Sequence, residues 1–179
     1  MRLFIAIDLN QRVKDYLYGL QREIAIPEAA LSFSSGFHIT LKFLGEVSEE
    51  RLASLKSTLR EIKFSSFKIR TSGVGFFKKK NQIKVVWSGV EPKEEIEILQ
   101  KRIERNLLEL GFERDKKFHP HITIARVKKL KDKEKFIEKL KNIEKREIYT
   151  NVDSFVLFRS QLTSQGPIYT VIEKFKAES

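Results

Sequence analysis

The tripeptide His-Ile-Thr occurs twice, at residues 38–40 and 121–123, and the two copies use two of the three histidines in the 179-residue chain. Histidine is the side chain best suited to gain or lose a proton near neutral pH. Each copy lies in a run with β-strand character, and on a strand residues i and i+2 point to the same side. Two such strands brought together would surround a small anionic group with an acid, a base and two hydroxyl donors. That arrangement is the outline of a phosphodiester active site.

One His-x-Thr strand alone would be weak evidence, because chance and core packing often produce it. The duplication favours function, since both copies continue with an aliphatic residue and both follow turn-like residues, Ser35–Phe37 and Phe118–Pro120. A metal site at His119-Pro120-His121 is a rival hypothesis. Catalytic zinc usually needs three protein ligands, and no carboxylate lies near either motif at ligand spacing. We therefore expect no metal and no cofactor, with His119 at the start of the strand or as a peripheral phosphate contact.

Hydrophobic periodicity predicts the elements that must position these motifs. Helices are expected through Val13–Ile24, Leu52–Ile62, Ile96–Leu110 and Phe136–Ile143, and strands at Arg2–Leu9, Phe37–Leu44, Phe67–Phe76, Gln82–Val90, His121–Val127, Glu147–Phe158 and Ile168–Phe175. A strand, a helix, a His-x-Thr strand and another helix follow one another twice. We predict an α+β fold in which residues 1–179 form a single bilobal domain without a linker. Two pseudo-symmetric, antiparallel-rich sheets flanked by helices would enclose a central cleft.

Composition narrows the class of partner. Lys and Arg number 35 against 24 Asp and Glu, and the net charge of +11 favours a polyanion, with nucleic acid first. The absence of cysteine excludes disulfides, thiolate nucleophiles and cysteine-bound metals. The chain contains no run of 18 apolar residues, so no membrane-spanning helix is predicted. The apolar start is too short for a signal peptide and reaches Asp8 at once, so we expect a cytoplasmic protein with no membrane partner.

Four stretches resemble one known family. These are Phe-His-Ile-Thr-Leu-Lys-Phe-Leu-Gly-Glu-Val from residue 37, Phe-His-Pro-His-Ile-Thr-Ile-Ala-Arg from residue 118, Arg-Leu-Phe-Ile-Ala-Ile from residue 2, and the closing Ser160–Leu162 with Gly166–Tyr169. Together they cover essentially the whole chain. They resemble the 2H phosphoesterase superfamily and, within it, the RNA 2′,3′-cyclic phosphodiesterases, also named 2′-5′ RNA ligases (the LigT/ThpR type). The family more often has arginine where this chain has His119.

The resemblance implies a metal-independent reaction that opens a 2′,3′-cyclic phosphate at an RNA end to a 2′-phosphate. His38 would be the general acid that protonates the departing 3′-oxygen, and His121 the general base that activates water. Thr40 and Thr123 would donate hydrogen bonds to the non-bridging oxygens. Reverse 2′-5′ ligation would use the same site. The implied partner is RNA with 2′,3′-cyclic phosphate ends, tRNA halves among them, and the protein is expected to be a monomer.

Three further residues are candidate substrate-binding groups. Strand parity places Lys42 on the face of the first motif, where it would contact the phosphate or lie solvated at the cleft edge. Arg126 is off-parity from the second motif and would need a bulge or a strand end to reach the substrate. Tyr169 could stack on a base or occupy a half-buried sheet position. Phe43 and Trp87 are expected in the core.

Two other functions stay open on sequence alone. One is a basic RNA-binding module without chemistry, although no recognised aromatic platform is found in the chain. The other is a 2H phosphodiesterase for a small cyclic nucleotide such as ADP-ribose 1″,2″-cyclic phosphate. The charge of +11 favours a longer RNA without deciding the question.

Overall fold

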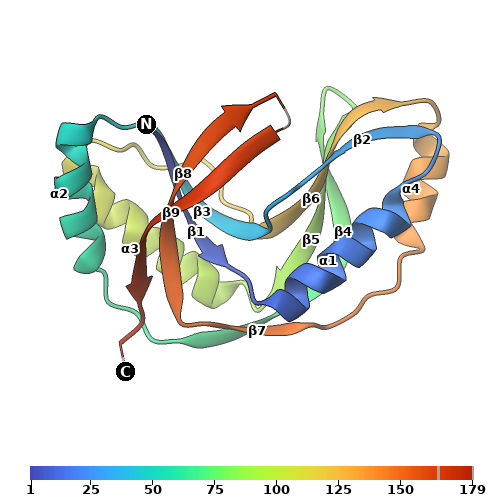
Figure 1. Ribbon diagram of the computed structural model, residues 1–179. Helices are drawn as coiled ribbons and strands as arrows, with labels where there is room; N and C mark the ends of the chain where they lie inside the picture. Colours follow the sequence, from blue (N-terminus) through green and yellow to red (C-terminus); the bar gives the residue numbers. More distant parts are fainter. Residues whose placement is uncertain (165, 179) are drawn as a thin grey trace.

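A curled antiparallel sheet forms the centre of the structure, a computed structural model that describes residues 1–164 and 166–178. Its helices lie along the outer side of the curl (Figure 1). In chain order the elements are β1 (Arg2–Asp8), α1 (Gln11–Ile24), β2 (Ala29–Phe33), β3 (His38–Glu46), α2 (Glu49–Arg60), β4 (Phe67–Lys79), β5 (Gln82–Glu91), α3 (Glu94–Leu107), a 3-10 turn (Leu108–Leu110), β6 (His121–Leu130), α4 (Lys133–Lys141), β7 (Tyr149–Val152), β8 (Ser154–Thr163) and β9 (Gly166–Lys176). None of the described helices is long and apolar enough to cross a membrane.

The sheet has two halves that meet at the two motif strands. Its order is β7-β4-β5-β6-β3-β1-β8-β9, and β2 adds to β6 on the side of β3. β3 and β6 carry the two His-Ile-Thr motifs and are joined at one register pair, Ile39 opposite Ile122. The predicted α+β class with two pseudo-symmetric halves is confirmed. The structure adds that the two halves are linked into one continuous sheet.

The internal repeat is confirmed, and its helices interlock the halves. Each motif strand pairs with the first strand of its own repeat, β3 with β1 and β6 with β5. The first helix of each repeat, however, packs on the other half, because α1 contacts β6 and α3 contacts β3 (Figure 1). Neither half can therefore bury its sheet without a helix supplied by the other.

The two faces of the sheet differ sharply. The main core lies between the sheet and the helices and includes Ile39 and Ile122, both 0% exposed. A smaller cluster of Phe4, Ala6, Val156 and Phe158, with Tyr169 packed against it, lies apart from this core. We call the sheet face opposite the helix-covered core the motif face, because both His-x-Thr pairs point to it.

A β-bulge follows each motif and reverses the alternation of the strand. In β3, Lys42 pairs with Ile5 and Thr40 with Ala6, so Leu41 is an extra residue. In β6 the corresponding extra residue is Ile124, between the pairs made by Thr123 and Ala125. Both strands consequently show the same burial pattern, in which two consecutive buried residues are followed by an exposed one. A residue after the bulge takes the face opposite to the one that parity predicts.

Lys42 is the first residue affected, and the prediction that it shares the face of His38 is wrong. Its side chain is 3% exposed on the helix side of the sheet. The ammonium Nζ lies 2.9 Å from Glu104 Oε1 on α3, 2.7 Å from the carbonyl oxygen of Glu113 and 3.3 Å from Asp115 Oδ1. Lys42 is thus a buried ion-pair partner that fixes α3 to β3.

The same bulges bring two other side chains to the motif face. Phe43, expected in the core, is 65% exposed, with its ring 6.2 Å from that of Phe4. Arg126, expected to point away unless a bulge intervened, is exposed on the side of the second motif. The bulge that it required is present.

Elsewhere, the predicted helices all form, and the strand predictions differ from the structure in two places. β2 was not predicted, because Ala29–Phe33 is short and contains no β-branched residue. It forms by pairing with β6, from Ala29 opposite Leu130 to Phe33 opposite Ala125. The single strand expected at Glu147–Phe158 is divided into β7, which pairs with β4, and β8, which pairs with β1 and β9.

We expect Lys42→Met to lower the free energy of unfolding by about 3–5 kcal/mol, because the buried Glu104 carboxylate loses its cation. Urea denaturation measures this change. The double variant Lys42→Met/Glu104→Leu should recover most of the loss, since the carboxylate that remains, Asp115, is 42% exposed and can be solvated. Lys101→Met, at an exposed position of α3, is the control and should change stability by less than about 0.5 kcal/mol. A double variant as unstable as the single one would contradict a structural role for the pair.

Candidate active site

The pair formed by Ile39 and Ile122 sets the geometry of the candidate site. Both isoleucines point into the core, so the residues on either side of each point to the motif face. Because β3 and β6 are antiparallel, His38 lies across from Thr123 and Thr40 across from His121. Opposite Cβ atoms in such a ladder are about 5 Å apart and diagonal ones about 7–8 Å. The two histidines therefore stand on one diagonal and the two threonines on the other.

His38 lies against aromatic rings. Its ring centroid is 4.9 Å from that of Phe4, 5.2 Å from that of Tyr169, which meets it edge-on, and 6.2 Å from that of Phe158. The pKa of His38 is lowered to about 4, chiefly by burial and to a smaller extent by the nearby His121 and Lys14, whereas the Asp8 carboxylate and a backbone hydrogen bond to Gly36 act to raise it. In the free protein His38 is consequently neutral at neutral pH.

His121 is oriented by the backbone just before it. Its Nδ1 lies 2.7 Å from the carbonyl oxygen of His119. A carbonyl can only accept, so Nδ1 carries the proton, and Nε2 is the basic nitrogen of the neutral ring. Burial lowers the pKa of His121, the hydrogen bond to His119 raises it, and the charges of His119 and Arg126 lower it. A neutral imidazole with a fixed tautomer is the form that a general base requires.

Tyr169 packs beside His38 and is half-buried. Its ring centroid is 5.2 Å from those of Phe4 and His38. Burial raises the pKa of the Tyr169 hydroxyl, while the charges of Arg126 and Arg2 act to lower it. The Tyr169 ring can approach the turn before the first motif only because residue 36 is glycine. An added Cβ at Gly36 would lie 2.9 Å from Tyr169 Cδ2. Arg126 is thus near enough to act electrostatically on both Tyr169 and His121.

Comparisons with known proteins match the part of the chain that carries both motifs. The family model of the 2′-5′ RNA ligase superfamily matches residues 34–163, a range that contains both motifs. The chain belongs to this superfamily. The chain is 35% identical over 178 residues to the RNA 2′,3′-cyclic phosphodiesterase of Methanocaldococcus jannaschii, covering 98% of this chain and 100% of that relative. Its identity to the RNA 2′,3′-cyclic phosphodiesterase of Thermotoga maritima is 38% over 183 residues, covering 99% and 96%.

Solved structures agree with the fold. A crystal structure of a Thermus thermophilus protein matches with a TM-score of 0.78 and 29% identity over 98% of this chain and 97% of that one. Escherichia coli LigT complexed with 3′-AMP matches with a TM-score of 0.81 and 24% identity over 99% and 98% of the two chains. The resemblance inferred from the sequence motifs is confirmed at the level of the superfamily and the fold.

Aromatic side chains from the second half of the sheet also surround His121. Phe77 lies 4.9 Å from the His121 ring and 5.3 Å from the ring of Trp87. Trp87, expected in the core, is half-buried and pairs in register with Thr123, so it belongs to the motif face. His119 is exposed, with its ring 5.1 Å from that of Trp87, and burial lowers its pKa. In the described part of the chain, no cluster of three or more His, Asp or Glu side chains could hold a metal ion.

We expect Tyr169→Ala to raise the pKa of His38 from about 4 toward its ordinary value, because the ring that shields one edge of the imidazole is removed. A pH titration of the histidine ring signals by NMR measures this shift. His119 packs against Trp87 and serves as an internal reference, and Tyr149→Ala, at an exposed position of β7, is the matched control variant. An unchanged His38 titration in Tyr169→Ala would show that Tyr169 does not control the burial of that ring.

Proposed function

We propose that this protein opens 2′,3′-cyclic phosphate ends of RNA to 2′-phosphates, with His38 as proton donor and His121 as proton acceptor. The observation that carries the proposal is the diagonal arrangement of two imidazoles and two hydroxyls on one face. An in-line displacement at phosphorus needs a base on the side of the nucleophile and an acid on the side of the leaving oxygen. The RNA 2′,3′-cyclic phosphodiesterases at 35% and 38% identity support the choice of substrate.

In this mechanism Nε2 of His121 takes a proton from water as the water oxygen bonds to phosphorus. The bond from phosphorus to the 3′-oxygen breaks, and His38 gives its proton to that oxygen. Thr40 and Thr123 donate hydrogen bonds to the non-bridging oxygens, whose negative charge grows in the transition state. Arg126 adds positive charge beside His121. These groups supply acid, base and charge stabilisation without a metal.

The charges around the site support this division of roles. Burial lowers the pKa of both histidines. Asp8, paired in register with His38, opposes this lowering at His38, whereas Arg126 adds to it at His121. Both influences favour the proton on His38. Burial keeps His38 neutral in the free protein, so the negative charge of the bound phosphate must raise its pKa and load the acid. Each imidazolium also lowers the pKa of the other histidine, which favours a single shared proton.

Ligation would follow from the same geometry. If an RNA 5′-hydroxyl takes the place of water, the same acid and base form a 2′-5′ phosphodiester. The decisive experiment incubates the protein with a short RNA ending in a 2′,3′-cyclic phosphate, in EDTA, and identifies the product phosphate. A 2′-phosphate product supports the proposal, and intact cyclic ends in the presence of bound RNA would indicate a binding module. A parallel reaction with ADP-ribose 1″,2″-cyclic phosphate tests the small-nucleotide alternative.

Replacing either His38 or His121 with alanine should lower the turnover number about 10²- to 10⁴-fold, because each change removes one proton-transfer group. Steady-state rates on the cyclic-phosphate RNA measure the effect. His119→Ala is the control, since alanine keeps the backbone carbonyl that orients His121. Two single variants with near-normal turnover would exclude an acid–base pair.

The pH dependence should separate the free enzyme from its complex. The pKa values of His38 and His121 are both lowered in the free protein, so the singly protonated pair is most populated below pH 6.5. We expect kcat/KM to peak there and to fall as the pH rises, because it reports the free enzyme. The kcat optimum should lie at higher pH, since bound phosphate raises the pKa values. A kcat/KM optimum above pH 7 would contradict the proposed charge states.

A further inference from the structure

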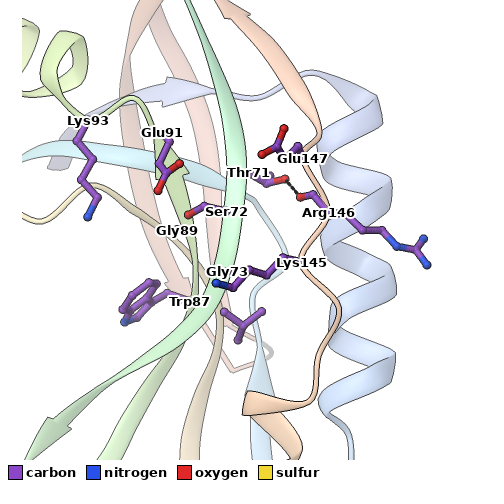
Figure 2. A pocket seen from close by; sticks show the side chains of 11 residues that line it. Thr71, Ser72, Gly73, Trp87, Gly89, Glu91, Lys93, Lys145, Arg146 and Glu147 are labelled. Carbon is purple, nitrogen blue, oxygen red and sulfur yellow. Dashed lines mark hydrogen bonds between the residues drawn. The ribbon is translucent and has the colours of Figure 1, made fainter.

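A pocket of about 390 Å³ lies beside His121 on the motif face and is not used by the mechanism above. Its lining includes Ser72, Gly73, Gly89, Lys93 and Lys145 (Figure 2). Gly89 pairs in register with His121, which places the pocket one strand away from the candidate active site. The β4 residues of the pocket are two strand spacings, about 10 Å, from the β6 strand that carries His121.

The shape of the pocket comes from a further bulge, in β4, and from glycine. Thr71 pairs with Val90 and Val74 with Ser88, so Ser72 and Gly73 together oppose Gly89. An added Cβ at Gly89 would lie 2.3 Å from Ser72 Oγ, and one at Gly73 would lie 3.0 Å from Lys145 Cε. The Ser72 hydroxyl and the stem of Lys145 approach the strands only because both positions lack side chains.

The segment that carries Lys145 is fixed to the edge of β4. The Thr71 hydroxyl donates to the carbonyl oxygen of Arg146 at 2.6 Å and accepts from the Ile148 N–H at 2.9 Å. Figure 2 shows Lys145 entering from this edge and Lys93 from the opposite side, at the corner between β5 and α3. The pocket is therefore held between two lysines anchored on separate elements.

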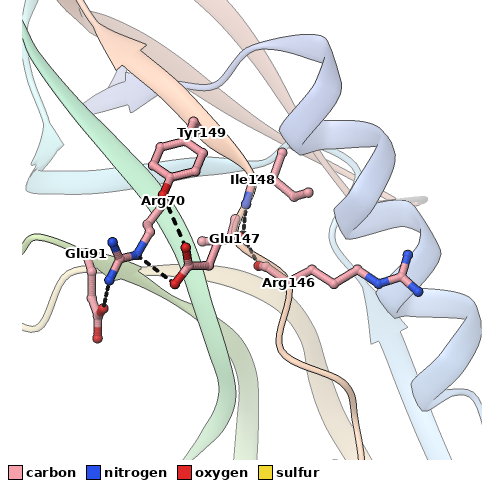
Figure 3. Close-up of polar contacts among 7 residues, drawn as sticks. Arg70, Glu91, Arg146, Glu147, Ile148 and Tyr149 are labelled. Atoms are coloured by element: carbon pink, nitrogen blue, oxygen red, sulfur yellow. Dashed lines mark hydrogen bonds and ion pairs between the residues drawn. The ribbon is translucent and has the colours of Figure 1, made fainter.

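The electrostatics of the pocket favour an anion. Arg70 pairs with both Glu91 and Glu147, at 3.1 Å and 3.3 Å, so that one guanidinium offsets one of the two negative charges (Figure 3). Over residues 1–164 and 166–178, neither Lys93 nor Lys145 forms an ion pair. Lys93, Lys145 and Arg70 together exceed the two carboxylates by one positive charge. Two ammonium groups that form no ion pair and a serine hydroxyl are suitable ligands for one phosphate group.

We infer that this pocket binds the phosphodiester immediately upstream of the cyclic end, so that the enzyme prefers a cyclic phosphate carried by a chain to one on a mononucleotide. The inference rests on the proposed function, because it assumes that the cyclic phosphate lies between His38 and His121. When the cyclic phosphate is bound between the two histidines, the next phosphate of the RNA lies about one nucleotide away along the motif face. A cyclic mononucleotide has no second phosphate and leaves the pocket without a ligand.

The test compares two substrates that share the same terminal nucleoside 2′,3′-cyclic phosphate, a mononucleotide and a trinucleotide. Lys93→Gln/Lys145→Gln should lower kcat/KM about tenfold for the trinucleotide and leave the mononucleotide rate within about twofold. The dependence of log(kcat/KM) on log[salt] should flatten by about 0.7 for the trinucleotide, the value expected for one phosphate contact on a single strand. Lys101→Gln/Lys141→Gln removes the same charge from exposed positions of α3 and α4 and should change neither substrate.

Equal losses on both substrates, or none on either, would overturn the inference. Dissociation constants for the corresponding 2′-phosphate products, measured by calorimetry, keep it separable from the proposed function. If the wild-type protein hydrolyses neither substrate, the proposed function fails. The binding of the trinucleotide and mononucleotide products to the lysine variant still decides whether the pocket holds a phosphodiester. Weaker binding of the trinucleotide product alone supports the inference, and any other result rejects it.

Discussion

The contact of Ile39 with Ile122 is the constraint on which the site depends. The two motif strands belong to different halves and meet in register at this one pair. A slip of one residue would turn a histidine and a threonine of one motif into the core and bring an isoleucine to the motif face. Burying both isoleucines completely gives that register its free-energy preference over the alternatives. Core packing on one side of the sheet thus fixes the spacing of the polar groups on the other.

The interlocked helices support the same junction. α1 and α3 each pack on the half that contains the other repeat, and the buried ion pair of Lys42 with Glu104 ties α3 to β3. The two halves therefore cannot separate without exposing helix-covered core. A site built across such a junction gains the rigidity that two crossed pairs of side chains require.

The surroundings of the histidines explain how similar motifs can take different roles. His38 lies among Phe4, Phe158 and Tyr169 with a carboxylate in register, and His121 lies beside Phe77 with a guanidinium nearby. Repetition in the sequence supplied two equal imidazoles. The neighbouring strands made them unequal, because charge and burial around a ring are set by residues far away in the chain.

Sequence patterns by themselves determined the four helices, the repeated order of elements and the two His-x-Thr strands, since these depend on local spacing and on periodicity. The family resemblance could also be identified, because its motifs are contiguous. One missed signal was present in the second motif strand, where the apolar residues shift from Ile122 and Ile124 to Ala125 and Val127, as a bulge requires. In the first motif strand the same shift cannot be recognised from the apolar residues, because the residue after the bulge is the charged Lys42. Only the tertiary structure decided which faces of the sheet carry Lys42, Phe43, Arg126 and Trp87, and that a pocket lies beside His121. The reason is that a bulge is defined by the register with a partner strand, and no local run of residues contains that register.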